Sequence, residues 1–324
     1  MKGEKRKRIF ITGGSGLLGG TLTGVWRERY EILFCYNRHR VSFKGARGFR
    51  LDLTDKNATL RLLREFSPEV ILHCAALTDV DYCENHPEEA QVVNVETTRT
   101  LTEVANQLGA KLIYLSTEAV YEGNRGRYSE EDPPQPINRY AKSKLEGEDA
   151  VRSGGGDWFI ARTGFEGWRF HPDLGKQGFF EWLILKFQEG RPIPVFSDRY
   201  FTPFSVYNFV EVLEEVVRKN IQGLFNVEGS ERCGYVEFAE IVAREFDFES
   251  SLIQPVLMEN VPSKVKRPKD TSLNISRIQS QIETKILDVE ETVRDLKSFR
   301  DNGGLDRLRQ ELQNDPRVSN SVPG

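Results

Sequence analysis

Short runs of β-branched and aromatic residues alternate with longer segments of helical hydrophobic spacing through the first half of the chain. The strand-like runs cover residues 8–12, 31–36, 48–51, 69–74, 111–116 and 158–162. The helical segments between them are a stretch ending near residue 27 and residues 55–66, 90–108 and 139–151. Because strands that alternate with helices form βαβ units, this half predicts an α/β fold with a doubly wound parallel sheet of the Rossmann type.

The pattern loosens after Thr163. Helices are predicted over residues 179–188, 206–219, 235–246 and 289–299, with a short strand at 224–227. A loop rich in Gly, Trp and Phe spans 164–178, residues 262–277 are irregular and basic, and residues 305–312 predict a short helix before a frayed end.

These elements predict two domains and a tail. The Rossmann domain would comprise residues 1–165 plus about 203–227, and a smaller, mostly C-terminal α/β substrate domain would comprise about 166–202 and 228–298. Residues 299–324 form a polar C-terminal tail. The length of 324 residues agrees with two domains of about 150 residues each.

Charge and hydropathy argue against several classes of protein. The 45 Lys and Arg residues are balanced by 49 Asp and Glu, a net charge of −4, so no basic field collects nucleic-acid phosphates. No run approaches the ~20 apolar residues of a membrane helix. The basic N-terminus, residues 2–8, lacks the apolar segment of a secretory signal. We therefore expect a cytoplasmic protein that binds neither nucleic acid nor membrane.

The cysteines and histidines follow no metal-binding or disulfide pattern. The four histidines show no i, i+4 pairing, and the four cysteines form no C-x-x-C pair: Cys35, Cys74, Cys83 and Cys233. We expect no metal ion and a reducing, cytoplasmic setting.

Three glycines in a G-x-x-G-x-x-G spacing follow the first strand and open the next helix. This spacing permits a tight turn and close approach of the backbone to a pyrophosphate, which the N–H groups of the helix N-terminus can bind. A plain structural turn is the alternative, but the position between strand and helix favours a dinucleotide. The predicted contacts in this loop are Gly13, Ser15, Gly16, Leu17, Leu18 and Gly19.

The end of the second strand predicts which dinucleotide binds. NAD-binding sites usually place Asp or Glu there for the ribose 2′-hydroxyl, but this strand ends at Tyr36-Asn37 and is followed by Arg38-His39-Arg40. An arginine can hold a 2′-phosphate with two hydrogen bonds, so we expect NADP(H), with NAD(H) as the alternative. The further predicted cofactor contacts are Asn37, Arg38, Asp52, Leu53, Cys74, Ala75, Ala76, Thr78 and Asn94.

A candidate catalytic group follows the fifth strand. Ser116-Thr117 ends that strand, and Tyr140 and Lys144 lie four residues apart on one face of a predicted helix. A phenol has a pKa near 10, and a neighbouring ammonium lowers that pKa. Tyr140 can then give a proton to a carbonyl oxygen held by Thr117 while a hydride arrives at carbon. A surface Tyr–Lys pair is the alternative interpretation.

The glycine motif together with Tyr140-x-x-x-Lys144 resembles the extended short-chain dehydrogenase/reductases. Three further segments resemble the dTDP-4-dehydrorhamnose reductase family within them: residues 75–84, AALTDVDYCE; residues 116–123, STEAVYEG; and residues 267–273, RPKDTSL. The resemblance covers about residues 7–298.

The resemblance implies transfer of a hydride from a reduced nicotinamide to C4 of a dTDP-4-keto-6-deoxyhexose. It implies a catalytic set of Thr117, Tyr140 and Lys144, with Lys144 and Tyr140 also touching the cofactor and Asn94 near the site. Glu118 and Ala119 depart from the family's S-T-D-Y segment. The candidate substrate contacts are Thr78, Val80, Glu118, Phe165, Phe179, Trp182, Arg199 and Arg267.

Several alternatives stay open at this point. Phe179 and Trp182 can equally be core aromatics, and Arg199 and Arg267 surface cations. A nucleotide-sugar epimerase or dehydratase on the same scaffold is a second interpretation, because Glu118 directly follows Thr117. A third is a cofactor-binding regulatory subunit, like that of methionine adenosyltransferase, which would dock through the C-terminal tail. The expected partner is a nucleotide sugar, and a homodimer is compatible with the sequence.

Overall fold

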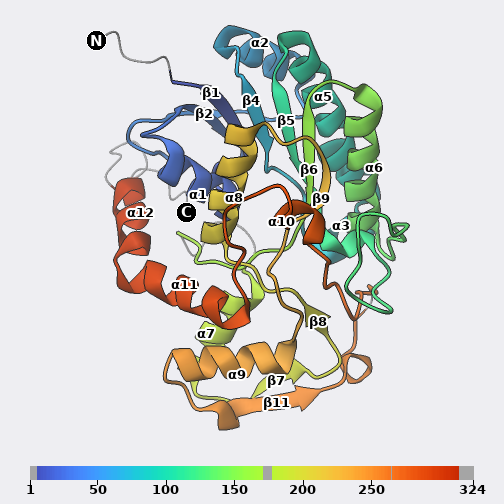
Figure 1. Ribbon diagram of the computed structural model, residues 1–324, viewed down its shortest axis with the longest axis vertical. Coiled ribbons are helices and arrows are strands. Elements are labelled where there is room, and N and C mark those ends of the chain that lie inside the picture. Colours follow the sequence, from blue (N-terminus) through green and yellow to red (C-terminus); the bar gives the residue numbers. More distant parts are fainter. Residues whose placement is uncertain (1–5, 171–176, 264, 314–324) are drawn as a thin grey trace, which may run out of the picture.

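A seven-stranded parallel sheet forms the upper part of the molecule in Figure 1. The computed structural model describes residues 6–170, 177–263 and 265–313. The strand order is β3-β2-β1-β4-β5-β6-β9. The strands are β1 (Arg8–Thr12), β2 (Glu31–Tyr36), β3 (Arg47–Arg50), β4 (Val70–His73), β5 (Lys111–Leu115), β6 (Trp158–Arg162) and β9 (Gly223–Asn226). The predicted doubly wound fold is confirmed, and its order reverses between β1 and β4.

Helices cover both faces of this sheet (Figure 1). Alternating strand residues decide which face each side chain reaches: Ile9 and Ile11 pack with α1 (Leu17–Trp26) and α8 (Val206–Lys219), whereas Phe10 packs on the opposite side. That opposite face is covered by α2 (Lys56–Phe66), α5 (Thr97–Leu108) and α6 (Arg139–Gly154). Burial on both faces explains why inner strands such as β4 and β5 read as continuous buried runs, whereas the edge strand β3 is exposed.

The elements in the lower part of Figure 1 enclose a second core, in which aromatic side chains pack among aliphatic ones. It packs α7 (Phe179–Glu189), α9 (Tyr235–Glu245) and α11 (Val289–Asp301) against short strands. A parallel pair joins β7 (Ile193–Phe196) to β11 (Ile253–Val256), and an antiparallel pair joins β8 (Tyr200–Phe201) to β10 (Cys233–Gly234). The sequence pattern did not predict these four strands, because runs of two to four residues are too short to show a period.

The predicted single helix over residues 90–108 is wrong in detail. The structure has α3 (Val80–Asn85), α4 (Pro87–Gln91) and a π-helical turn, η1 (Val92–Glu96), before α5 begins at Thr97. In the turn the Thr97 hydroxyl donates to the Val92 carbonyl, five residues back, over 3.2 Å. Asn94 lies within this turn, and hydrophobic spacing does not reveal its hydrogen bonds, which are described below.

The C-terminal tail is more structured than the sequence suggested. Helix α11 continues to Asp301, and α12 (Gly304–Gln313) contains the predicted short helix at 305–312. Leu305 and Leu308 are buried, and Leu308 lies against Gly24 of α1. The end of the tail, residues 314–324, and the first residues of the basic N-terminus lie outside the described residues.

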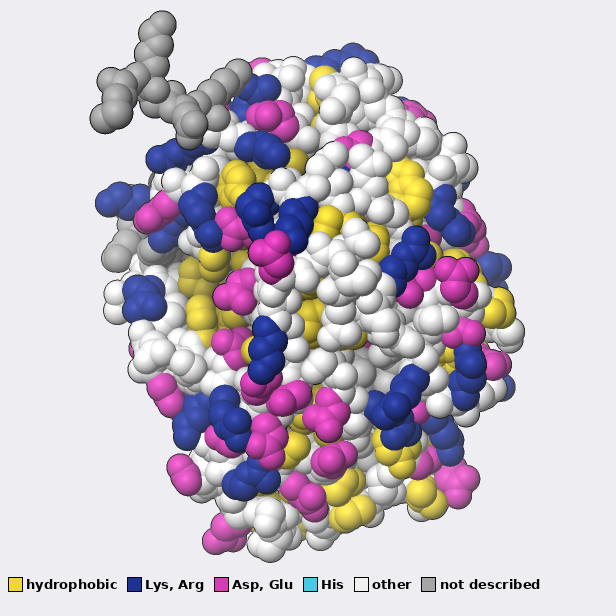
Figure 2. Space-filling view, viewed as in Figure 1, with side chains coloured by type: hydrophobic (Ala, Val, Ile, Leu, Met, Phe, Trp, Pro, Cys, Tyr) yellow, Lys and Arg dark blue, Asp and Glu magenta, His cyan; other side chains and the backbone are white. Residues whose placement is uncertain are grey.

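The remaining elements are short. They are η2 (Glu118–Val120), η3 (Ser250–Leu252), η4 (Met258–Asn260) and α10 (Ser276–Gln279), the last beginning at the end of the segment predicted to be irregular. Basic and acidic side chains are interspersed on the face in Figure 2. Within the described ranges, every helix is too short or too polar to cross a membrane.

Candidate nucleotide-binding and catalytic site

Two adjoining cavities lie at the carboxyl ends of the parallel strands, where doubly wound sheets bind ligands. The first cavity, of about 660 Å³, extends past β1, β2 and β4. The second cavity, of about 720 Å³, extends from the glycine loop to α6 and the second half of the chain. Gly13, Gly16, Cys74 and Ala76 line both, so the two cavities form one cleft.

The glycine loop at this junction fits a dinucleotide. Gly13 has a φ of +68°, and a Cβ at Gly19 would lie 2.4 Å from the Gly13 carbonyl oxygen. Gly16 is the N-cap of α1, and no side chain in the described part of the chain caps the first turn. The N–H groups there are therefore open to an anion, and the positive end of the helix dipole favours one.

The predicted cofactor residues divide between the two cavities. Gly13, Ser15, Gly16, Asn37, Arg38, Asp52, Leu53, Cys74, Ala75 and Ala76 line the first. Leu17, Leu18, Gly19, Thr78, Tyr140 and Lys144 line the second. The sequence missed the opposite wall of the first cavity, which includes Glu88, Glu89 and Val92, because these residues come from helical segments without any nucleotide-binding signature.

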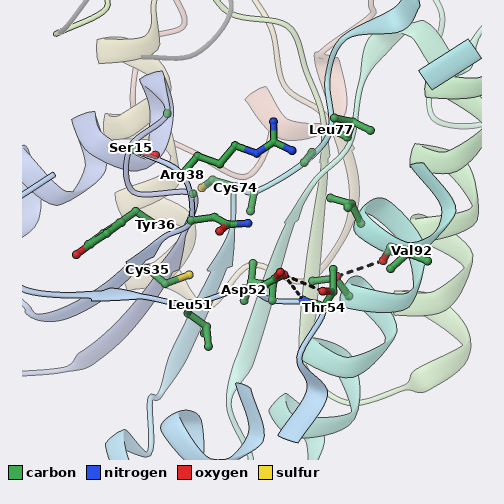
Figure 3. Close-up of a pocket in the computed structure, with 18 of the residues that line it drawn as sticks. Ser15, Cys35, Tyr36, Arg38, Leu51, Asp52, Thr54, Cys74, Leu77 and Val92 are labelled. Atoms are coloured by element: carbon green, nitrogen blue, oxygen red, sulfur yellow. Dashed lines mark hydrogen bonds between the residues drawn. The ribbon is translucent and has the colours of Figure 1, made fainter. Parts of the chain in front are cut away.

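Two polar side chains of the first cavity, Asp52 and Arg38, already have partners, and Figure 3 shows the hydrogen bonds of Asp52. Asp52, a predicted cofactor contact, accepts hydrogen bonds through Oδ1 from the backbone N–H and hydroxyl of Thr54, at 3.0 and 2.8 Å. Arg38 lies 4.0 Å from Glu89, with 79% of its side chain exposed. An exposed ion pair at this distance is weak, so the guanidinium is able to turn toward a phosphate.

Thr117, Tyr140 and Lys144 come together in the second cavity. Thr117 follows β5, and its hydroxyl and the phenol of Tyr140 belong to the wall of the same cavity. Lys144, one turn along α6 from Tyr140, is buried with its Nζ 4.2 Å from the centre of the Tyr114 ring. The arrangement places a phenol, a hydroxyl and a cation at the wall of one cleft.

Asn94 has its side chain fully engaged by the protein. Its Oδ1 accepts from the Leu77 N–H at 2.8 Å, and its Nδ2 donates to the Leu77 carbonyl at 3.0 Å and to Ser143 Oγ at 2.9 Å. Asn94 is buried and joins the segment after β4 to α6. It therefore holds the wall of the site in place and does not line either cavity among the described residues.

The pKa of Tyr140 moves against the sequence-based expectation. Burial raises the pKa of the phenol, and the nearby Glu118 carboxyl adds to the rise. Burial also lowers the pKa of Lys144 to about 7, against the opposing effect of Glu148. Because a buried phenolate is costly, the phenol stays protonated, which suits a proton donor.

A group of buried carboxyls lies behind the catalytic residues. Glu118 Oε2 accepts a hydrogen bond from the Thr117 hydroxyl at 2.8 Å. The carboxyls of Glu118 and Glu228 both approach Gly164, where an added Cβ would lie 3.2 Å from one oxygen of each. Burial raises the pKa of Glu118, Glu228 and Glu166, the last to about 7. The sequence missed Glu166 and Glu228, which carry no motif.

The predicted substrate contacts separate into two groups. Thr78, Val80, Glu118, Phe165, Arg199 and Arg267 line the second cavity. Phe179 and Trp182 are absent from its lining among the described residues; Phe179 stacks on Tyr235 at 4.2 Å, and Trp182 on Phe179 at 5.9 Å, in the aromatic core.

The cations of the second cavity differ in their partners. Arg267 donates to Asp81 at 2.5 Å. Arg199 lies over the ring of Tyr235, and its buried Nε has no hydrogen-bond partner in the described part of the chain. Gln177, which the sequence did not single out, also lines this cavity, and its Nε2 has no hydrogen-bond partner among the residues that the structure describes. Buried N–H groups without acceptors mark where ligand oxygens would bind. Across the described ranges, no three His, Cys, Asp or Glu side chains gather as metal ligands.

Known proteins resemble the chain over most of its length. The probable low-salt glycan biosynthesis reductase of Haloferax volcanii is 30% identical over 84% of this chain and 91% of its own. The methionine adenosyltransferase 2 subunit beta of Bos taurus is 29% identical over 85% and 82%. The dTDP-4-dehydrorhamnose reductase of Bacillus anthracis, solved in complex with NADP, is 27% identical with a TM-score of 0.80, over 90% and 99%.

The doubly wound sheet, the glycine loop and the pair of Tyr140 and Lys144 define an extended short-chain dehydrogenase/reductase. The family model for the RmlD substrate binding domain matches residues 7–299. The chain belongs to this family, and the family resemblance stated from the sequence is confirmed.

Proposed function

We propose that the protein uses NADPH to reduce the 4-keto group of a nucleotide-linked deoxysugar. The observation that carries this proposal is the grouping of Tyr140, Thr117 and the buried Lys144 at the wall of one cavity, which is continuous with the glycine loop. The similarity to two proteins named as reductases supports the reaction class.

Each residue has a distinct role in the proposed reaction. The nicotinamide, when bound, supplies the hydride. Tyr140 gives its proton to the keto oxygen, and Thr117 hydrogen-bonds the same oxygen. The Lys144 ammonium stabilises the phenolate that forms as the proton leaves, which offsets the burial that otherwise opposes ionisation of Tyr140.

The cleft also supports the choice of ligands. Arg38 would hold the 2′-phosphate of NADPH in the first cavity, since no acid ends β2. Arg199 and Gln177 would donate to oxygens of the sugar or its diphosphate in the second cavity.

Replacing Tyr140 with Phe tests the proposal. Y140F removes the donated proton, so we expect turnover of a dTDP-4-keto-6-deoxyhexose to fall about 100- to 1000-fold. Oxidation of NADPH is measured by absorbance, and NADPH affinity, measured by fluorescence, should stay within about twofold. Y30F is the control, because Tyr30 bonds Glu214 and lines neither cavity among the described residues. Normal turnover in Y140F would contradict the role of Tyr140.

A regulatory subunit is the second candidate, because of the similarity to methionine adenosyltransferase 2 subunit beta. Its test is co-purification with a methionine adenosyltransferase catalytic chain from the same organism. A stable complex, together with wild-type chain that binds NADPH but reduces no keto sugar, would favour this candidate. Turnover without complex formation would favour the reductase.

A further inference from the structure

A buried carboxylate lies on the catalytic face of α6. Tyr140, Lys144 and Glu148 are spaced at i, i+4 and i+8, so their side chains follow one another along that face. Glu148 is 0% exposed and lines neither cavity among the described residues. The proposed reaction gives it no direct contact with a ligand.

Three hydrogen bonds hold this carboxylate. Ser116 Oγ donates to Oε1 at 2.5 Å, and Arg162 Nε donates to the same oxygen at 2.9 Å. Arg162 Nη2 donates to Oε2 at 2.7 Å. Arg162 is 1% exposed, so the pair is buried and two-pronged, the geometry in which such a pair is strongest.

The partners of Glu148 come from the segments that form the second cavity. Ser116 directly precedes Thr117. Arg162 ends β6, directly before Thr163 and Gly164, which line the cavity. Arg162 Nη1 also donates to the Tyr121 hydroxyl at 2.6 Å, beyond η2. One carboxylate therefore joins the helix of Tyr140 and Lys144 to the ends of β5 and β6.

Glu148 also affects the charge of Lys144. The other groups facing Lys144 are the Tyr114 ring on β5, Tyr140 one turn earlier, and His73 and Cys74 at the end of β4. Burial lowers the pKa of His73 to about 3 and raises that of Cys74 to about 12, so both are neutral near pH 7. Glu148 is thus the anion that faces the ammonium among the described residues.

We propose that Glu148 is a positioning residue of the proposed reductase, which fixes Thr117 relative to Tyr140 and keeps Lys144 in its ammonium form. This inference rests on the proposed function for its kinetic part. Its electrostatic part concerns Lys144 alone and can be measured without turnover.

The variant E148Q removes the charge and keeps an acceptor oxygen. We expect kcat to fall about 100-fold through misplacement of the catalytic groups. The alkaline limb of the profile of kcat against pH should move to lower pH by about one unit. The reason is that an ammonium without its counter-ion loses its proton at a lower pH. Competitive acetylation of Lys144 by acetic anhydride, followed across pH by mass spectrometry, measures the deprotonation midpoint of Lys144, which is the pH at which half of the ammonium has lost its proton. This measurement needs no substrate.

The control is D157N, which disrupts a partly buried ion pair at the other end of the same two strands. Asp157 precedes β6 and lies 2.5 Å from Lys111, the first residue of β5. D157N should reduce thermal stability without moving the midpoint of Lys144. E148Q leaves Arg162 buried beside a neutral partner, so the variant E148D is also measured. Because E148D keeps the negative charge, kcat should fall while the alkaline limb of its pH profile stays in place.

The outcomes are distinguishable. A lower midpoint of Lys144 in E148Q, unchanged in D157N and E148D, supports the proposal. An unchanged midpoint in folded E148Q, or a shift of equal size in D157N, overturns it. If the wild-type chain reduces no keto sugar while the E148Q midpoint still moves, the proposed function fails and the electrostatic role of Glu148 stands.

Discussion

At the edge of the first cavity, Arg38 is the side chain on which the choice between NADPH and NADH depends in our proposal. Its pair with Glu89, 4.0 Å away and mostly exposed, contributes little. Asn37 lies beside it in the cavity wall, where an NAD-binding site usually has an acid. A 2′-phosphate would therefore meet a cation without a strong competitor.

The variant R38A tests this assignment. Loss of the charged hydrogen bonds should raise the Kd for NADPH about 10- to 100-fold and leave the Kd for NADH within about twofold. Both are measured by fluorescence titration. R61A is the control, because Arg61 is exposed on α2 and lines neither cavity among the described residues. Equal weakening of both cofactors would show that Arg38 acts on the fold of the loop instead.

Individual site residues were predictable to different degrees. Tyr140 and Lys144 were predicted because their spacing is local and belongs to one helix. The direction of the Tyr140 pKa was wrong, because the burial that sets it comes from segments far away in sequence. Gln177 was missed for the same reason, because only the folded chain brings it to the cavity. Glu166 and Glu228 were missed because only the fold brings them near Glu118.

At the scale of single elements, the first turn of α1 leaves no space for a side chain at Gly19. A Cβ at Gly19 would lie 2.4 Å from the Gly13 carbonyl oxygen, a backbone atom that cannot move without opening the loop. A Cβ at Gly24, on the same helix, would meet the end of the Leu308 side chain, which can change rotamer. The two glycines therefore provide a matched pair.

We expect G19A to weaken NADPH binding by at least about 10-fold while the protein remains folded, since the loop must shift away from the phosphates. G24A should bind NADPH normally. Affinity is measured by fluorescence titration, and folding by circular dichroism. Unchanged affinity in G19A would place the phosphates elsewhere in the cleft.

The strands and helices of the first half were predictable because buried parallel strands are continuous apolar runs, such as β4 and β5. Elements defined by long-range pairing were not. The strand β7 contains Pro194 and is only four residues long, and its partner β11 lies about 60 residues later in the chain. Its strand character comes from that partner.

For the whole molecule, the buried carboxyls predict how stability depends on pH. Burial raises the folded-state pKa of Glu166 from its ordinary value of 4.5 to about 7, and Glu118 adds to the rise. The folded state thus binds more protons than the unfolded state between these values. The contribution of protonated Glu166 to the free energy of unfolding is therefore complete below about pH 4.5, and it is lost as the pH rises through 7.

The variant E166Q cannot ionise, so it should lose this part of the pH dependence. At pH 8 we expect E166Q to exceed the wild type in free energy of unfolding by about 1 to 3 kcal/mol, while the two converge near pH 4.5. Urea denaturation at several pH values measures the difference. E189Q, a surface change on α7, is the control. Parallel curves for E166Q and the wild type would contradict the prediction.

The π-helical turn η1 has a consequence for insertions and deletions in this chain. The turn holds one residue more than a regular helix, and Asn94 lies inside it with its bonds to Leu77 and Ser143. Deleting one residue there would give a regular helix but rotate one part against the other by about 100°. Asn94 would then face away from α6, so the length of this segment is as constrained as the identity of Asn94.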